Sequence, residues 1–263
     1  MSINPLEFLP LWAYFSITVV FIGGSVFAGW IVGTRSYERS GELEGASIGI
    51  TVGALLSLLG FLLAFTFSMV NARFEDRRQA VLVEANAIGT AYLRADLLPD
   101  TNGAEARGLL REYIDIRIVS SDFGFTDEEV DHLISESERL QTALWAVATK
   151  AAQGAPTPIS GFFVQSINDI IDVHAVRVVF GTRSTIPHEI WICLYVLAAV
   201  GMAASGFQVA NSGGRNAYPT LALVLTFSAI LTVITDLDSP GHGMMRTDQA
   251  PLIGQAASMG PGA

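Results

Sequence analysis

The sequence is poor in charge and in the residue patterns that build catalytic or metal sites. Only 15% of its 263 residues are charged, whereas soluble domains usually carry about 25%. Its single cysteine, Cys193, excludes a disulfide within the chain. The four histidines are scattered without metal-ligand spacing, and no phosphate-binding, dinucleotide-binding, zinc-protease or serine-hydrolase motif occurs. We therefore expect no cofactor and no metal.

Positive charge is scarcer than negative charge. The formal net charge is −10, and a protein that binds nucleic acid needs a basic surface to contact phosphates. Nucleic acid is therefore excluded as a partner.

Long uncharged runs are what the sequence does have. They cover 27 residues at 8–34, 28 at 45–72, 25 at 190–214 and 20 at 216–235. About 20 apolar residues cross the hydrocarbon layer of a bilayer as a helix. Nothing basic precedes the first run, which argues against a signal peptide. The sequence predicts transmembrane helices at 8–34, 45–72, 187–210 and 216–236, and hence a multi-pass protein in a lipid bilayer.

The block at 73–186 between the second and third spans is predicted to be helical. No proline interrupts 45–98, so the second span should continue as a soluble helix to about residue 98. Further helices are expected at 104–119, 126–154 and 159–180, and no alternating strand pattern is present. The fold class is thus an all-α membrane protein with an α-helical soluble block between spans 2 and 3. The C-terminal tail, 237–263, is glycine-rich beyond Pro251 and is expected to be disordered there.

Arginines near the span ends predict the orientation in the cell (inner) membrane. Cytoplasmic loops carry an excess of basic residues. Five arginines flank the soluble block and three lie on the opposite side, which places the block and both termini in the cytoplasm. The five are Arg73, Arg77, Arg78, Arg177 and Arg183, and the three are Arg35, Arg39 and Arg215.

The second span has two different faces when residues are placed at 100° steps. One face holds small residues, which allow close helix approach in lipid, and we predict that it is the packing face. The other face is bulky and meets either lipid or the axis of an oligomer, where it would form an apolar constriction. The small face comprises Gly49, Gly53, Gly60 and Ala64, and the bulky face Leu58, Phe61, Phe65 and Met69.

The fourth span ends in an acidic motif, DLDSPGHG. Asp236 and Asp238 lie at a helix C-terminus, where the helix dipole disfavours carboxylates. Either they cap the helix stop before the turn at Pro240, or they form a latch to the soluble block. Candidate partners for such a latch are Arg73, Arg77 and Arg78.

Two of these segments carry a resemblance to a known family. The run GFLLAFTFSMVNARFEDRRQAVLVEANAIGTAYLRADLLP, followed by a helical block, two spans and DLDSPGHG, resembles the bestrophin-like domain family of bacterial membrane proteins. A more distant similarity extends to bestrophins, which are pentameric ion channels whose second helices line the pore with an apolar neck. The resemblance implies an oligomeric, pentameric channel for inorganic ions with Phe61 and Phe65 at its neck. Residues 73–189 hold 11 basic and 18 acidic side chains, which favours cations.

Two other functions compete with the channel. One is a non-conducting membrane adaptor or sensor whose cytosolic helices bind a partner, since 122–138 holds seven acidic and no basic residues. The other is a membrane enzyme, which is disfavoured because nothing places a nucleophile, a base and an orienting group together. Its candidate residues are Glu84, Glu112, Asp115, Asp169, Asp172 and His174.

Overall fold

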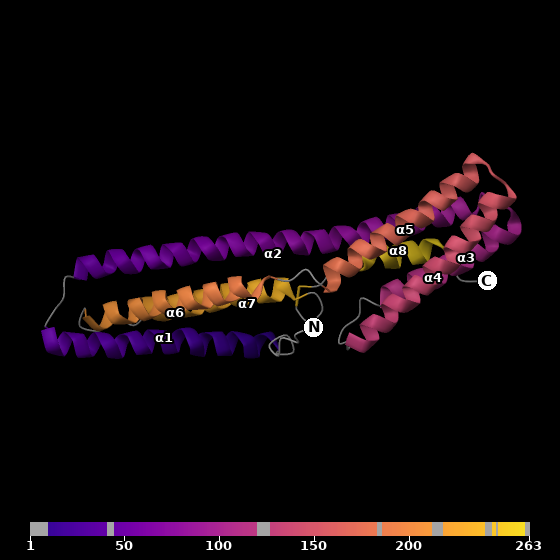
Figure 1. Cartoon of the computed structure of the whole chain (residues 1–263). Helices are drawn as coiled ribbons and strands as arrows, with labels where there is room; N and C mark the ends of the chain where they lie inside the picture. The colour runs from indigo at the N-terminus through magenta and orange to yellow at the C-terminus, as the bar shows by residue number, and fades with distance from the viewer. Residues whose placement is uncertain are drawn as a thin grey trace. The chain divides into compact units, whose positions relative to one another are not determined.

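The computed structural model describes residues 10–40, 45–119, 127–182, 186–211, 218–239, 244–245 and 247–260. The described residues form eight α-helices and no strand (Figure 1). The all-helical prediction is confirmed. The helices are α1 (Leu11–Ser40), α2 (Gly45–Ala95), α3 (Asp100–Val119), α4 (Asp127–Gly154), α5 (Pro158–Thr182), α6 (His188–Asn211), α7 (Tyr218–Asp238) and α8 (Ala250–Ser258).

The chain divides into two compact units. The membrane unit contains α1, α6, α7 and α2 up to Ala72. The charged unit contains α2 from Arg73 onward together with α3, α4, α5 and α8. Only α2 is common to both, because its 51 residues make a rod of about 75 Å, more than twice the ~30 Å of a hydrocarbon layer.

Four helices are long and apolar enough to cross a membrane, namely α1, α2, α6 and α7. Aromatic side chains lie near the ends of three of them, as is typical of the membrane interface. Trp12 lies in the first turn of α1 and Trp191 in the first turn of α6, while Tyr37 lies near the end of α1 and Tyr218 begins α7. The four predicted spans therefore correspond to four helices of membrane-spanning character.

Helix α1 runs parallel to α6 in the membrane unit, and α7 runs antiparallel to both (Figure 1). Near the start of both α1 and α6, the hydroxyl groups of Tyr14 and Tyr195 form a hydrogen bond. Further along, a methyl group on Gly29 would overlap the carbonyl oxygen of Ala203. The backbones approach so closely because glycine leaves room there, which is how helices associate in lipid.

The charged unit has a conventional apolar core. Helix α3 packs on α4, α4 packs on α5, and α8 packs on α3. The fully buried side chains come from α2, α3, α4, α5 and α8, because each of these helices turns an apolar face toward the core. The largest are Ile88, Leu110, Tyr113, Ile114, Leu140, Leu144, Phe163, Ile167 and Ile170.

The C-terminal tail departs from the sequence-based expectation, because residues 250–258 form α8 rather than a disordered segment. Pro251 lies in the first turn, where its missing N–H costs nothing. Leu252 is completely buried in the core, and the carbonyl oxygen of Met259 accepts hydrogen bonds from Tyr92 (2.9 Å) and Arg111 (2.7 Å). Because the residues that order this short helix lie on α2 and α3, its formation could not be predicted from the local sequence. Helix α3 also starts four residues earlier than expected, at Asp100.

Candidate functional site

The membrane part of α2 has one buried side and one exposed side. The buried side faces the rest of the membrane unit, and near it Leu55 and Leu56 lie in contact range of Gly201 on α6. Its buried residues are Val52, Leu59, Leu63, Thr66 and Val70. At 100° per residue the middle of the exposed side lies opposite these positions.

The bulky residues proposed from the sequence lie mainly on the exposed side. Phe61 is 67% and Phe65 61% exposed, and Leu58 is half exposed. Met69 is only partly exposed and lies at the edge of this face. Phe61 and Phe65, which are one helical turn apart, therefore form an apolar stripe that the described part of the chain leaves uncovered.

The small residues form a second exposed stripe beside the first. Gly53, Gly60 and Ala64 are exposed, and a methyl group on Gly53 or Gly60 would meet no described atom within 4 Å. Gly49 alone is partly buried, next to the side-chain amide of Gln208. Within the chain the packing side of α2 is thus a different one. A packing role for the small stripe requires another chain and stays a prediction.

The close helix contact in the membrane unit was missed from the sequence. An added methyl group would collide with Ala203 of α6 at Gly29, with Phe207 and Ala210 at Gly33, and with Val26 of α1 at Gly206. The residue pairs Gly29/Gly33 and Gly206/Ala210 each have the spacing of four that marks close-packed membrane helices. The signal was therefore present in GWIVG and GFQVA.

The acidic motif is held by backbone N–H groups. Asp236 accepts hydrogen bonds from the N–H groups of Met244 (2.6 Å) and Met245 (3.1 Å), which follow α7 in the chain. Asp238 accepts from the N–H of Ile186 through both oxygens, at 2.9 and 3.1 Å. Both side chains are buried. These bonds offset the unfavourable helix-dipole interaction, as expected for capping aspartates, and they tie the end of α7 to the segment before α6.

The proposed latch arginines belong to the charged unit. Arg78 is exposed and pairs with Glu75 at 3.7 Å, Arg77 is buried and Arg73 is partly buried. Arg77 lies over the ring of Phe74, 6.0 Å from its centroid. Pro240 lies outside the described residues. A latch from the acidic motif to these arginines stays a prediction.

A buried ion cluster occupies the interior of the charged unit. Glu84 of α2 is fully buried, and its two oxygens pair with Arg117 of α3 at 2.8 Å and with Arg177 of α5. Tyr113 donates to the same carboxylate at 3.3 Å and accepts from Gln141 of α4 at 3.1 Å. Burial raises the pKa of the Tyr113 hydroxyl, so it remains a hydrogen-bond donor at all ordinary pH values.

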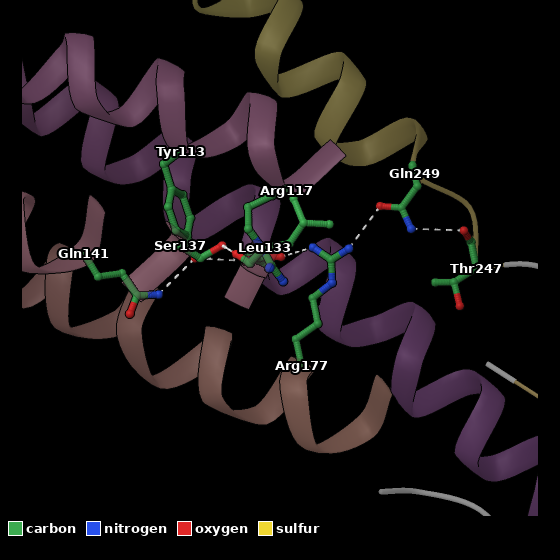
Figure 2. A network of polar contacts seen from close by, with 9 residues as sticks. Tyr113, Arg117, Leu133, Ser137, Gln141, Arg177, Thr247 and Gln249 are labelled. Atoms are coloured by element: carbon green, nitrogen blue, oxygen red, sulfur yellow. Dashed lines mark hydrogen bonds and ion pairs between the residues drawn. The ribbon is translucent and has the colours of Figure 1, made fainter. Parts of the chain in front are cut away.

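Figure 2 shows the same cluster from close by. Tyr113, Arg117 and Arg177 converge from different helices, and Arg177 continues to the side-chain oxygen of Gln249, just before α8, at 3.3 Å. One carboxylate thus connects α2, α3 and α5, and Arg177 extends the connection to the C-terminal segment. The sequence alone did not predict this cluster.

The residues considered for catalysis do not assemble into one site. Glu84 forms ion pairs with two arginines, and Glu112 forms an ion pair with Arg139 on the surface at 3.0 Å. Asp115 is exposed, and Asp169 and Asp172 accept hydrogen bonds from neighbours on their own helix. Among the described residues, no group of three or more histidine, cysteine, aspartate or glutamate side chains is placed to hold a metal.

Comparison with known proteins places the chain in a family. A model of the Bestrophin-like domain matches residues 18–252. The chain belongs to the bestrophin-like family. No curated protein matches it in sequence.

Solved structures share the fold of this bestrophin-like protein. A bacterial Bestrophin homolog from Klebsiella pneumoniae matches with a TM-score of 0.61 at 15% identity, over 94% of each chain. One variant of that homolog gives 0.64 at 15% identity over 95% of this chain and 96% of the other. A second variant gives 0.66 at 13% identity over 95% of each. This chain therefore shares the fold of the bestrophin homolog over nearly its whole length.

Proposed function

We propose that the protein is an ion channel formed by a ring of identical chains, five in number, with α2 of each chain next to the central axis. Four spans in one chain are too few to enclose a conduit of their own, so conduction requires a ring. Family membership and the fold it shares with bestrophin homologs support this function.

One observation on α2 carries the proposal. Its exposed membrane side presents two neighbouring stripes of different character, small residues at Gly53, Gly60 and Ala64 and aromatic residues at Phe61 and Phe65. Exposed glycines have no side chain to pack against lipid, yet they allow another helix to approach closely. A neighbouring chain seated on the small stripe leaves the aromatic stripe facing the axis.

The aromatic stripe then forms the neck of the conduit. A ring of apolar side chains hinders ion passage because a narrow apolar channel loses its water. Phe61 and Phe65 are the principal neck residues, with Leu58 and Met69 at the edges of the stripe. The permeant species is an inorganic ion, and the excess of acidic side chains in residues 73–189 favours cations.

The orientation belongs to the same proposal. The arginine distribution around the spans favours a cytoplasmic charged unit with both termini inside. Fusion of a reporter that fluoresces only in the cytoplasm tests the C-terminal end, and fluorescence is the expected result.

A pair of matched substitutions tests the neck. Phe65→Ser should increase ion flux through liposomes containing the protein, because a hydroxyl group keeps the neck wet. Phe27→Ser on α1 is the control, since Phe27 is an exposed membrane phenylalanine of nearly equal exposure (60%) on another helix. Equal flux for Phe65→Ser, Phe27→Ser and the unmodified protein, with all three folded and inserted, would exclude Phe65 from a neck.

The adaptor remains the second candidate, because α4 presents acidic side chains to solvent. Glu128, Glu129 and Asp131 are exposed near its start, and Glu138 further along. A basic partner segment would complement them. Failure of the unmodified protein and of Phe65→Ser to conduct any inorganic ion would favour this alternative over the channel.

A further inference from the structure

One titratable side chain in the charged unit has no part in the proposed channel. His174 of α5 is 4% exposed, and neither ring nitrogen has a hydrogen-bond partner among the described residues. Buried polar atoms in native proteins nearly always have partners. A buried imidazole without partners therefore requires an explanation beyond packing.

Charged side chains from three helices act on His174. The charged groups that act on it are Glu84 from α2, Arg117 from α3 and Arg177 from its own helix. Gln141 from α4 and Gln249 from the segment before α8 also join the cluster, and both side chains are uncharged (Figure 2). While the imidazole of His174 is neutral, these charged groups comprise two positive arginines and one negative carboxylate.

We propose that the charged unit responds to acid through His174: when this side chain takes up a proton, it becomes a third buried cation beside Arg117 and Arg177, and α5 loosens from the ion cluster that joins it to α2 and α3. The device does not require ion conduction, since it depends only on the packing of α5. Its effect reaches the C-terminal segment because Arg177 also binds Gln249.

Thermodynamic linkage gives the direction of the response. Burial is the main cause that lowers the pKa of His174, to about 4 from its usual 6.5, with Arg117 acting in the same direction. In an opened state the imidazole regains its usual pKa and binds a proton below pH 6.5. The opened state thus gains protons before the closed state does, and closure weakens as the pH falls from about 6.5 toward 4.

Hydrogen exchange on the full-length protein in detergent tests this response. Peptides from α5 are followed at pH 7.5 and pH 5, with exchange rates corrected for the intrinsic effect of pH and compared with peptides from α6. The opening equilibrium of α5 should rise on the order of tenfold at pH 5. His174→Gln should abolish most of that rise, because glutamine remains uncharged.

The matched control is His132→Gln, which removes an exposed histidine of the same unit. It should respond to acid as the unmodified protein does. A rise that persists in His174→Gln, or that disappears equally in His132→Gln, would overturn the proposal. If His174→Gln does not fold, the unmodified protein decides alone: α5 exchange that does not increase at pH 5 relative to α6 contradicts the device. Neither outcome depends on whether the protein conducts ions.

Discussion

Each of the two units is stabilised internally by a different kind of interaction. In the membrane unit, α1 and α6 associate through glycines that let backbone contact backbone. In the charged unit, the helices bury large apolar side chains around a cluster of one carboxylate and two arginines. The difference follows from the solvent, because apolar surface gains nothing by leaving lipid but gains about 25 cal/mol per Å² by leaving water.

The two units also differ in the kind of substitution that weakens them. Loss of a buried charge partner is costly in the charged unit, since the remaining ions have no water to solvate them. In the membrane unit, gain of a single methyl group is costly where the backbones touch. Opposite kinds of substitution should therefore weaken the two units.

Glu84→Gln should have the largest effect. It removes the carboxylate that pairs with both Arg117 and Arg177, and should lower the free energy of unfolding of the charged unit by about 3–5 kcal/mol. Denaturant unfolding followed by hydrogen exchange in α3 and α5 measures this. The control, Glu112→Gln, breaks an exposed pair with Arg139 and should cause no measurable change. Similar losses for both would mean that burial of the cluster is unimportant.

Leu252→Ala should release the C-terminal helix. Leu252 is completely buried, and truncation of a buried leucine costs about 2–5 kcal/mol. Because α8 is short, this cost should appear as fast hydrogen exchange throughout residues 250–258. Ile253→Ala, at a neighbouring position that is 54% exposed, should leave α8 protected. Protection of α8 in both variants would contradict its docking on the core.

Gly29→Ala should have the smallest effect of the three and should act on the membrane unit. The added methyl group collides with the backbone of Ala203, and such overpacking costs about 1–3 kcal/mol. Thermal unfolding in detergent measures the loss. Gly24→Ala on the same helix is the control, because its methyl group meets no described atom and alanine favours the helix. A variant at Gly29 as stable as the control would show that α1 and α6 do not depend on close approach.

Much of the fold was predictable because its signals are local. Uncharged runs fix the spans, and the absence of proline from 45–98 predicts the long α2. Features that depend on contacts between distant segments were not predicted. Helix α8 is ordered by Tyr92 and Arg111, and the ion cluster joins Glu84 to arginines 33 and 93 residues away.

The candidate site was predictable in part. Helical projection places Phe61 and Phe65 on one face of α2 and Gly53, Gly60 and Ala64 on another, and the roles proposed for both faces stay predictions. Among the described glycines of the membrane unit, those whose added methyl group would collide with the backbone of a neighbouring helix are Gly29, Gly33 and Gly206. Periodicity reveals which residues share a face of a helix, yet it does not reveal which face another helix covers.

Native mass spectrometry of the detergent-solubilised complex determines whether the chains form a ring. Because a ring with α2 at its axis requires several copies, we expect a complex of five 28.1 kDa chains. A bulky substitution in the small stripe, Gly60→Leu, should reduce that mass, because it blocks the approach of a neighbouring α2. A monomer or dimer of the unmodified protein would contradict the channel.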